Sequence, residues 1–286
     1  MSKTQNPIGI FDSGTGGLTV AKAVRKLLPN ENLIYFGDTA HLPYGDKSTE
    51  AIQSYSLKIA NFLMAQHCKV ILIACNSASA ASYKLLKEYV GSKARVMNVI
   101  DPMVAHISER YAGKNIGLIG TKQTINSNVY KKKIDDLNQN ITLKSLATPL
   151  LAPMIEEGFA QNKILANVVE QYLSDVALEN IEALILGCTH YPLIKNQINN
   201  FYNSNHSENN LEDNDKSEVE NIVLLDSSEI VAKSLRGMLE MEDLLNRSVE
   251  KGKSKFYISD YTKSFEATAQ LFFDETLHLS HYPLWE

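Results

Sequence analysis

Short hydrophobic runs alternate along the chain with longer stretches in which apolar residues recur at helical spacing. The first part of the chain contains strand-like runs at 8–11, 33–37, 70–74 and 96–100 and helical stretches at 18–28, 49–66, 78–89 and 104–111. Runs of four or five apolar residues are typical of buried strands, whereas a period near 3.6 is typical of helices. The alternation therefore predicts parallel sheets covered by helices, with ligands bound beyond the carboxyl ends of the strands.

The same alternation starts again after residue 114. Strand-like runs lie at 115–120, 141–146, 183–187 and 221–226, with a helical stretch at 162–178. A helix is expected at 228–246. Residues 255–260 are expected to form the final strand before a closing helix.

Two pairs of segments repeat one design at different places in the chain. IGIFDSGTGG at 8–17 resembles IGLIGTKQT at 116–124, and VILIACNSAS at 70–79 resembles ALILGCTHYP at 183–192. Each is a buried strand that breaks into a small polar turn. The sequence thus predicts an α/β fold of two similar lobes with mainly parallel sheets and an active site in the cleft between them.

The lobes are expected to divide the chain discontinuously. The first lobe comprises residues 1–98 and 226–286, and the second comprises residues 99–225. Within the second lobe, the segment 203–221 is rich in Asn, Ser, Asp and Glu and contains almost no apolar residues. It is expected to be an exposed and poorly ordered insertion, because it cannot bury enough apolar surface to offset its ordering entropy.

Composition narrows the class of protein further. The 286 residues are 44% hydrophobic and 21% charged, which is typical of an ordinary globular protein. A net charge of −5 lacks the basic excess of a general nucleic-acid binder, and no run approaches the eighteen apolar residues of a membrane span. The three cysteines cannot all pair and lack zinc-ligand spacing, and the N-terminal segment has no signal-peptide pattern. We therefore expect a cytoplasmic protein with reduced thiols and no metal.

The turn DSGTGG at 12–17 combines an acid, a hydroxyl and three glycines where a strand passes into a helix. Backbone N–H groups at such a turn suit an anion. The spacing matches neither the P-loop nor the dinucleotide fingerprint, and no lysine in the candidate motifs could hold pyridoxal phosphate. A small carboxylate is the expected ligand, and no cofactor is expected.

Two cysteines end buried strands and are followed at once by polar residues. Cys75 precedes Asn76 and Ser77, and Cys188 precedes Thr189 and His190. A single buried cysteine is most often a small hydrophobic residue, and that is how we interpret Cys68. The position of the other two at the first turn of a following helix is expected to lower the thiol pKa. Two such thiols facing each other across a cleft suggest a paired acid and base.

The two cysteines suggest a functional role for several other polar residues. His190 could tune the thiol beside it, although an isolated histidine is more often a surface or capping residue. Asp12 could be only a helix cap. In the turn-rich segment 37–48, Tyr44 and Gly45 could line a ligand pocket, although the segment by itself predicts only a loop.

As a set, these motifs resemble the glutamate racemase family closely. The matching segments are IGIFDSGTGGLTV, YFGDTAHLPYG, ILIACNSASA, IGLIGTKQTI and LILGCTHYPLI, in that order. The resemblance spans about Ile8 to Ile194 and continues more loosely to residue 286. It implies two α/β lobes, cofactor-independent interconversion of L- and D-glutamate, a role in supplying D-glutamate for peptidoglycan, and a homodimer.

The resemblance also implies a role for each matching residue. Cys75 and Cys188 match the two catalytic cysteines, and Asp12 and His190 match the groups that assist them. Asp38 and Glu156 match acidic residues near the site. The implied substrate contacts are Asp12, Ser13, Tyr44, Gly45, Asn76, Ser77, Thr189 and His190. The chain departs from the family pattern at Ser77, where Thr is usual, at His41, where Arg is common, and in the insertion.

The chemistry agrees with this interpretation. Inverting a stereocentre by removing a proton from one face and returning one to the other requires two acid/base groups on opposite sides of Cα. Two alternatives stay open at this point. One is a racemase of the same family acting on aspartate or another amino acid. The other is a thiol-redox or carboxylate-binding protein that uses the cleft without racemising anything.

Overall fold

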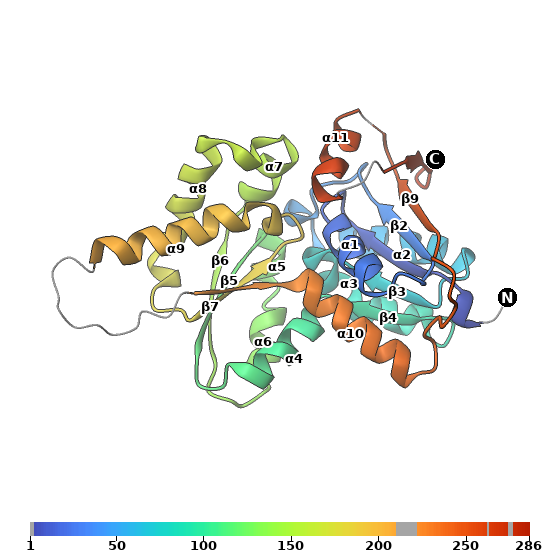
Figure 1. Ribbon diagram of the computed structural model, residues 1–286, viewed down its shortest axis with the longest axis horizontal. Helices are drawn as coiled ribbons and strands as arrows, with labels where there is room; N and C mark the ends of the chain where they lie inside the picture. The colour runs from blue at the N-terminus through green and yellow to red at the C-terminus, as the bar shows by residue number, and fades with distance from the viewer. Residues whose placement is uncertain (1–2, 210–221, 262, 274–276) are drawn as a thin grey trace.

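The central strands of the protein are buried on both faces because helices cover both sides of two parallel sheets. The computed structural model describes residues 3–209, 222–261, 263–273 and 277–286. Figure 1 shows the two sheets in two lobes. The expected fold class, two α/β lobes with mainly parallel sheets, is confirmed, and every strand pairing in the described residues is parallel.

The first sheet has six strands in the order β10-β9-β2-β1-β3-β4. Their bounds are β1 Ile8–Asp12, β2 Leu33–Gly37, β3 Val70–Ile73, β4 Arg95–Asn98, β9 Ser254–Ile258 and β10 Leu279–His281. The first lobe thus takes strands from both ends of the chain. All residues of β1, β2 and β3 are buried, as their continuous apolar sequence requires.

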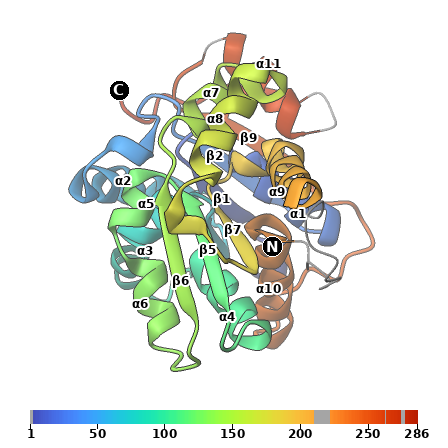
Figure 2. The same cartoon turned by 90° about the vertical axis from the view of Figure 1, so that its left-hand side faces the viewer.

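The second sheet has four strands in the order β6-β5-β7-β8. Their bounds are β5 Asn115–Gly120, β6 Thr142–Ala147, β7 Ala183–Gly187 and β8 Val223–Asp226. Figure 2, in which the second lobe faces the viewer, shows β5, β6 and β7 running together. The lobe boundaries that we propose from the sequence fall between β4 and the next helix and at the end of β8.

Helices connect successive strands on both faces of each sheet. Their bounds are α1 Leu18–Leu27, α2 Thr49–Ala65, α3 Asn76–Val90, α4 Ile100–Arg110, α5 Lys122–Asn126, α6 Val129–Asp135, α7 Leu151–Glu156, α8 Lys163–Leu173, α9 Lys195–Asn209, α10 Ser227–Met241 and α11 Lys263–Phe272. Side-chain caps fix several starting points. Ser48 accepts a hydrogen bond from Ala51 N–H at α2, and Asp226 accepts one from Ser228 N–H at α10. Among the described residues, no helix is long and apolar enough to cross a membrane.

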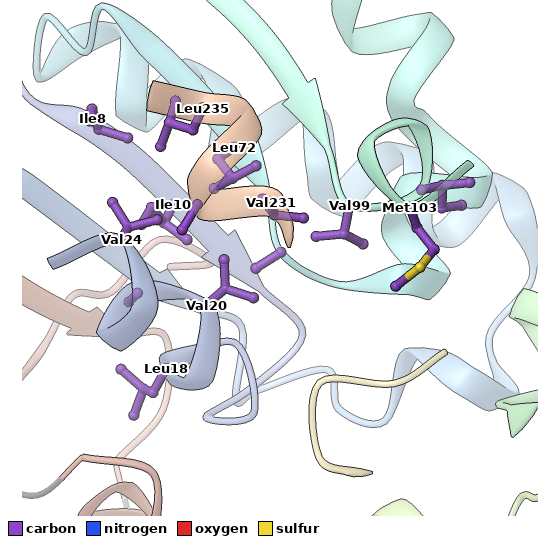
Figure 3. Packing of buried hydrophobic residues seen from close by; sticks show 14 of the residues in the cluster. Ile8, Ile10, Leu18, Val20, Val24, Leu72, Val99, Met103, Val231 and Leu235 are labelled. Carbon is purple, nitrogen blue, oxygen red and sulfur yellow. The ribbon is translucent and has the colours of Figure 1, made fainter. Parts of the chain in front are cut away.

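Helix α10 carries the chain back from the second lobe to the first and packs on both. Its Val231 and Leu235 are fully buried. Figure 3 shows them among side chains of β1, α1 and β3, including Ile10, Val20 and Leu72. The same hydrophobic cluster continues into the second sheet. The two lobes are therefore joined by one continuous core that fixes how their strand ends face each other.

Several sequence-based expectations need correction. Residues 255–260 do not contain the final strand, because β10 follows and pairs with β9. A three-residue strand held by backbone pairing leaves too short a pattern to detect. The predicted insertion at 203–221 overlaps α9, which continues to Asn209, and its remainder at 210–221 lies outside the described residues. The buried Ile198 anchors this helix, and backbone hydrogen bonds extend it through polar sequence.

Two helices are also shorter than their patterns suggested. The stretch 162–178 forms α8 only as far as Leu173, after which Asp175 caps a separate single turn. The stretch 228–246 ends as α10 at Met241. In both places a local cap or turn ends the helix although apolar residues continue.

A buried ion pair lies in the first lobe at the side where the strands begin, opposite their carboxyl ends. The ammonium group of Lys69 lies 2.5 Å from Glu31 Oε2 and donates to the Leu244 carbonyl at 2.9 Å. Glu31 Oε1 accepts the Asn246 N–H at 2.8 Å. Both charged side chains are almost completely buried. The pair thus connects β3 to the segment that follows α10.

We expect Lys69→Met to lower the free energy of unfolding by about 3 kcal/mol, because it leaves the Glu31 charge buried without its partner. Urea denaturation monitored by circular dichroism measures the loss. The matched control is Lys114→Met, which breaks an exposed pair with Glu182 and should cost less than about 1 kcal/mol. Equal losses in the two variants would contradict the importance of burial.

Candidate active site

A small cavity lies where the carboxyl ends of the two sheets meet. Its volume is about 20 Å³. The lining residues are Ser13, Pro43, Tyr44, Gly45, Cys75, Asn76, Ser77, Thr121, Ala152, Glu156, Gly187, Cys188, Thr189 and His190. They come from the ends of β1, β3, β5 and β7, from the loop after β2 and from α7. A single water molecule needs roughly 10–15 Å³, so the cavity in this form is too small for a molecule as large as an amino acid.

The structure brings most of the expected site residues together around this cavity. Both cysteines line it, one from each lobe. Asp12 and Asp38 are not among the lining residues and lie behind them. Thr121 lines the cavity although it was not singled out from the sequence. Its position directly after β5, in the segment that repeats the design of residues 8–17, is the signal that could have found it.

The glycine turn after β1 is organised around Asp12. The Asp12 Oδ2 atom accepts N–H hydrogen bonds from Gly14 at 3.3 Å and from Gly17 at 2.9 Å. A Cβ atom on Gly17 would lie 2.5 Å from the Asp12 Cβ, so glycine is required there. The expectation that the turn's N–H groups await an anion is therefore wrong at these two positions, because the chain's own carboxylate binds them.

Asp12 also has an acceptor atom without a partner among the described residues. Its side chain is completely buried, and Oδ1 has no hydrogen-bond partner among the described residues. Burial raises the pKa of Asp12, and the nearby His190 together with the two N–H hydrogen bonds opposes that rise. An ammonium group placed beside Oδ1 would satisfy the remaining acceptor.

Cys75 directly precedes α3 and acts as its N-cap. The sulfur accepts the Ala78 N–H at 3.4 Å, and the thiol donates to Ser13 Oγ at 3.8 Å. Burial raises the pKa of Cys75 well above its usual range, and the charge of Asp12 raises it further. The expected lowering of this thiol's pKa is therefore wrong, because removal from water outweighs the helix N–H group. Cys75 is a protonated thiol at neutral pH.

Cys188 has a different partner. Its sulfur lies 3.5 Å from His190 Nδ1, and His190 Nε2 lies 2.8 Å from Glu156 Oε1. Burial lowers the pKa of His190, but the Glu156 carboxylate and the Cys188 sulfur raise it more, so the net pKa is well above its usual value. Both ring nitrogens then carry protons and both have acceptors. In this form His190 Nδ1–H can donate a hydrogen bond to the Cys188 sulfur.

Glycine and hydroxyl groups bring the lobes into contact at the cavity. A Cβ atom on Gly16 would lie 2.5 Å from the His190 ring, so only glycine allows this approach. The hydroxyl of Thr19 donates to the Thr189 carbonyl at 3.2 Å. Ser77 Oγ lies 2.8 Å from Thr121 Oγ1 across the cleft, so the hydroxyl common to Ser and Thr makes the interlobe contact.

Asn76 lines the cavity and carries a donor without a partner among the described residues. Its Oδ1 accepts a hydrogen bond from the Tyr130 hydroxyl at 2.8 Å, which orients the amide. Its Nδ2 is buried without a hydrogen-bond partner among the described residues. A buried unsatisfied N–H group costs about 1–3 kcal/mol, so the amide favours binding of an acceptor such as a carboxylate.

The remaining features concern metals and the third thiol. Within the described ranges, no group of three or more His, Cys, Asp or Glu side chains could hold a metal ion. All three cysteines are free. Burial raises the pKa of Cys68 to about 12. This thiol lies in the hydrophobic core of the first lobe, not at the cavity.

Known proteins support one family assignment. A profile of the Asp/Glu/Hydantoin racemase family matches residues 18–204. The curated glutamate racemase of Neisseria meningitidis serogroup C is 35% identical over 276 residues, which cover 96% of this chain and 94% of that protein. The chain belongs to the glutamate racemases of the Asp/Glu/Hydantoin racemase family. Enzymes of this family are isomerases.

Solved glutamate racemases share the whole fold. The enzyme from Francisella tularensis, crystallised in complex with D-glutamate, is 37% identical with a TM-score of 0.86, and 99% of each chain is covered. The isoform RacE1 from Bacillus anthracis is 31% identical with a TM-score of 0.86, covering 98% of this chain and 99% of that chain. The resemblance seen in the sequence motifs is thus confirmed over almost the full length.

We predict that the Glu156 carboxylate keeps His190 in its imidazolium form. Glu156→Gln should lower the pKa of His190, because it removes the negative charge that stabilises the protonated ring. An NMR titration of protein labelled with ¹⁵N-histidine measures this pKa directly. Glu157→Gln, at an exposed neighbouring position, is the matched control and should leave the His190 pKa where it is. A His190 pKa that is the same in the Glu156→Gln and wild-type proteins would rule out the ion-pair explanation.

Proposed function

We propose that this protein interconverts L- and D-glutamate without a cofactor, using Cys75 and Cys188 as the two acid/base groups. The observation that carries the proposal is that these two thiols line one cavity from opposite lobes. Deprotonation at one face of Cα and protonation at the other needs this arrangement. Support for glutamate as the substrate comes from the relatives, including the structure solved with D-glutamate.

Polar groups around the cavity suit the substrate's amino acid moiety. The unsatisfied Asn76 N–H and the hydroxyls of Ser77, Thr121 and Thr189 can donate to a carboxylate. The unsatisfied Asp12 Oδ1 can accept from an ammonium group. Stabilising the carboxylate matters because charge develops on it when the Cα proton leaves, and preorganised donors act most strongly where water is excluded.

In the direction from L- to D-glutamate, the Cys188 thiolate takes the Cα proton and becomes a thiol. The electron pair of the broken C–H bond is delocalised into the adjacent carboxylate. The Cys75 thiol then gives its proton to the opposite face and becomes a thiolate. His190 stabilises the thiolate at the start, and the resting thiol of Cys75 is the correct form for a donor.

The reverse direction uses the same groups with the roles exchanged. Cys75 must then be a thiolate, which the charge of Asp12 disfavours in the free enzyme. The ammonium group of bound D-glutamate would neutralise Asp12 and so remove part of this opposition. The substrate thus helps to ionise the thiol that attacks it. Solvent exchange returns both sulfurs to their resting forms after each turnover.

The proposal extends to the cellular role expected from the resemblance. D-glutamate formed in the cytoplasm would serve as a building block for peptidoglycan. We also propose that the active species is a homodimer, which the native mass measured by light scattering will test.

Isotope transfer tests the two-face mechanism. When L-glutamate reacts in D₂O and the reaction is stopped early, the D-glutamate formed should carry deuterium at Cα, while recovered L-glutamate should stay mostly protiated. The incoming proton comes from the second thiol, which has equilibrated with solvent. Chiral chromatography with mass spectrometry measures both. Heavy early deuteration of L-glutamate would instead show that one group removes and returns the proton on a single face.

Removal of either thiol tests the need for both. Cys75→Ala and Cys188→Ala should each reduce racemisation by more than about a hundredfold, roughly 2.7 kcal/mol of barrier, because one base can only exchange a proton on its own face. Polarimetry of glutamate measures turnover, and aspartate in the same assay tests the alternative substrate. Cys68→Ala is the matched control and should retain activity, since this thiol lies in the core. Activity above a hundredth in either active-site variant would exclude the mechanism.

A further inference from the structure

Asp38 lies directly behind the wall of the cavity and is completely buried. Four side chains direct a donor at its carboxylate. They are Tyr44 at 2.6 Å from Oδ2, Ser259 at 2.7 Å from Oδ1, Trp285 Nε1 at 2.8 Å from Oδ1 and His41 Nδ1 at 3.0 Å from Oδ2. An ionised carboxylate offers about four acceptor positions, so this set satisfies Asp38 completely. Tyr44 is the member of the set that also lines the cavity.

Trp285 reaches Asp38 from the far end of the chain. The segment after β10 is fixed to the first lobe by the Tyr282 N–H, which donates to the Ile258 carbonyl at 2.9 Å. The indole ring lies edge-on to His41, with ring centres 4.4 Å apart, and the Lys58 ammonium lies 4.8 Å from its centre. These contacts fix the direction in which the indole N–H points.

Ser259 completes the same connection. Its hydroxyl accepts the Ala40 N–H at 3.0 Å, so its proton is directed at Asp38. Next to it, the Thr39 hydroxyl donates to the Asp260 carbonyl at 2.6 Å. The loop that follows β2 is thus held by residues more than 200 positions away in sequence.

We infer that Trp285 is a positioning residue for the active site: its indole N–H holds the Asp38 carboxylate, which in turn holds Tyr44 against the substrate cavity. Trp285 does not line the cavity, so it acts through Asp38 and Tyr44. Loss of its N–H leaves the buried Asp38 carboxylate with one donor fewer. Asp38 is then held less firmly, so the Tyr44 side chain that lines the cavity can move. The kinetic consequences of this inference rest on the proposed function, whereas its structural consequence does not.

The variant Trp285→Phe removes the N–H and keeps an aromatic ring in place. Tyr282→Phe is the matched control, because it changes one hydroxyl in the same segment and does not contact Asp38. In ligand-free protein, hydrogen–deuterium exchange of peptides covering residues 38–46 should become severalfold faster in Trp285→Phe and stay unchanged in Tyr282→Phe. Unchanged exchange in Trp285→Phe would overturn the inference. This arm gives its answer even if glutamate proves not to be the substrate.

Kinetics with glutamate separates positioning from a general loss of stability. Tyr44 lines the cavity and its hydroxyl donates to Asp38 rather than to a thiol, so Trp285→Phe should raise KM about tenfold while kcat stays within about threefold. A fall in melting temperature with both constants unchanged would mean that Trp285 has only a structural role. If wild-type protein does not turn over glutamate, the proposed function fails and the exchange experiment alone decides the inference.

A double variant tests whether Trp285 acts through Tyr44. In a Tyr44→Phe background the hydrogen bond to Asp38 is already absent, so adding Trp285→Phe should change KM by less than about twofold. If KM in the double variant instead rose by the product of the two single-variant factors, the two residues would act independently. That result would contradict the connection through Asp38.

Discussion

Two acid/base groups can address opposite faces of one carbon atom only if separate supports hold them on either side of the substrate. Parallel strands end at one edge of their sheet, so a single sheet places all its strand-end residues on the same side. This protein uses two parallel sheets whose carboxyl edges face each other, with Cys75 after β3 and Cys188 at the end of β7. The continuous core beneath α10 maintains that opposition.

The two thiols have the same chemistry but different surroundings, and the difference gives the resting site a direction. Burial raises the pKa of Cys75, and the nearby Asp12 raises it further. Cys188 lies beside an imidazolium that Glu156 stabilises. In the proposed mechanism, Cys75 is therefore the resting acid and Cys188 the resting base. Under the proposed mechanism, the reverse reaction requires this charge to be redistributed, and the substrate's own ammonium group is suited to assist.

Some buried polar groups of the protein have all their hydrogen-bond partners, whereas others lack one. Asp38 and the Lys69–Glu31 pair are surrounded by partners, and these groups hold loops and strands in place. Asp12 Oδ1 and the Asn76 Nδ2 group lack partners among the described residues. Unsatisfied groups beside a cavity supply binding energy to a ligand with matching donors and acceptors, whereas satisfied groups supply rigidity. At this site, the unsatisfied groups are those that we propose to bind the substrate, and the satisfied Asp38 is the one that we propose to position it.

The sequence by itself determined the fold class, the positions of the main strands along the chain and the set of strand-end residues, because buried strands and polar turns depend on local pattern. It also determined the family, since Cys75, Cys188 and their neighbours form contiguous motifs. Only the tertiary structure decided the pKa shifts of Cys75 and His190, because burial and the charges of Asp12 and Glu156 come from distant parts of the chain. For the same reason Trp285 carried no local signal: its contact with Asp38 joins residues separated by 247 positions and exists only once the first lobe has folded.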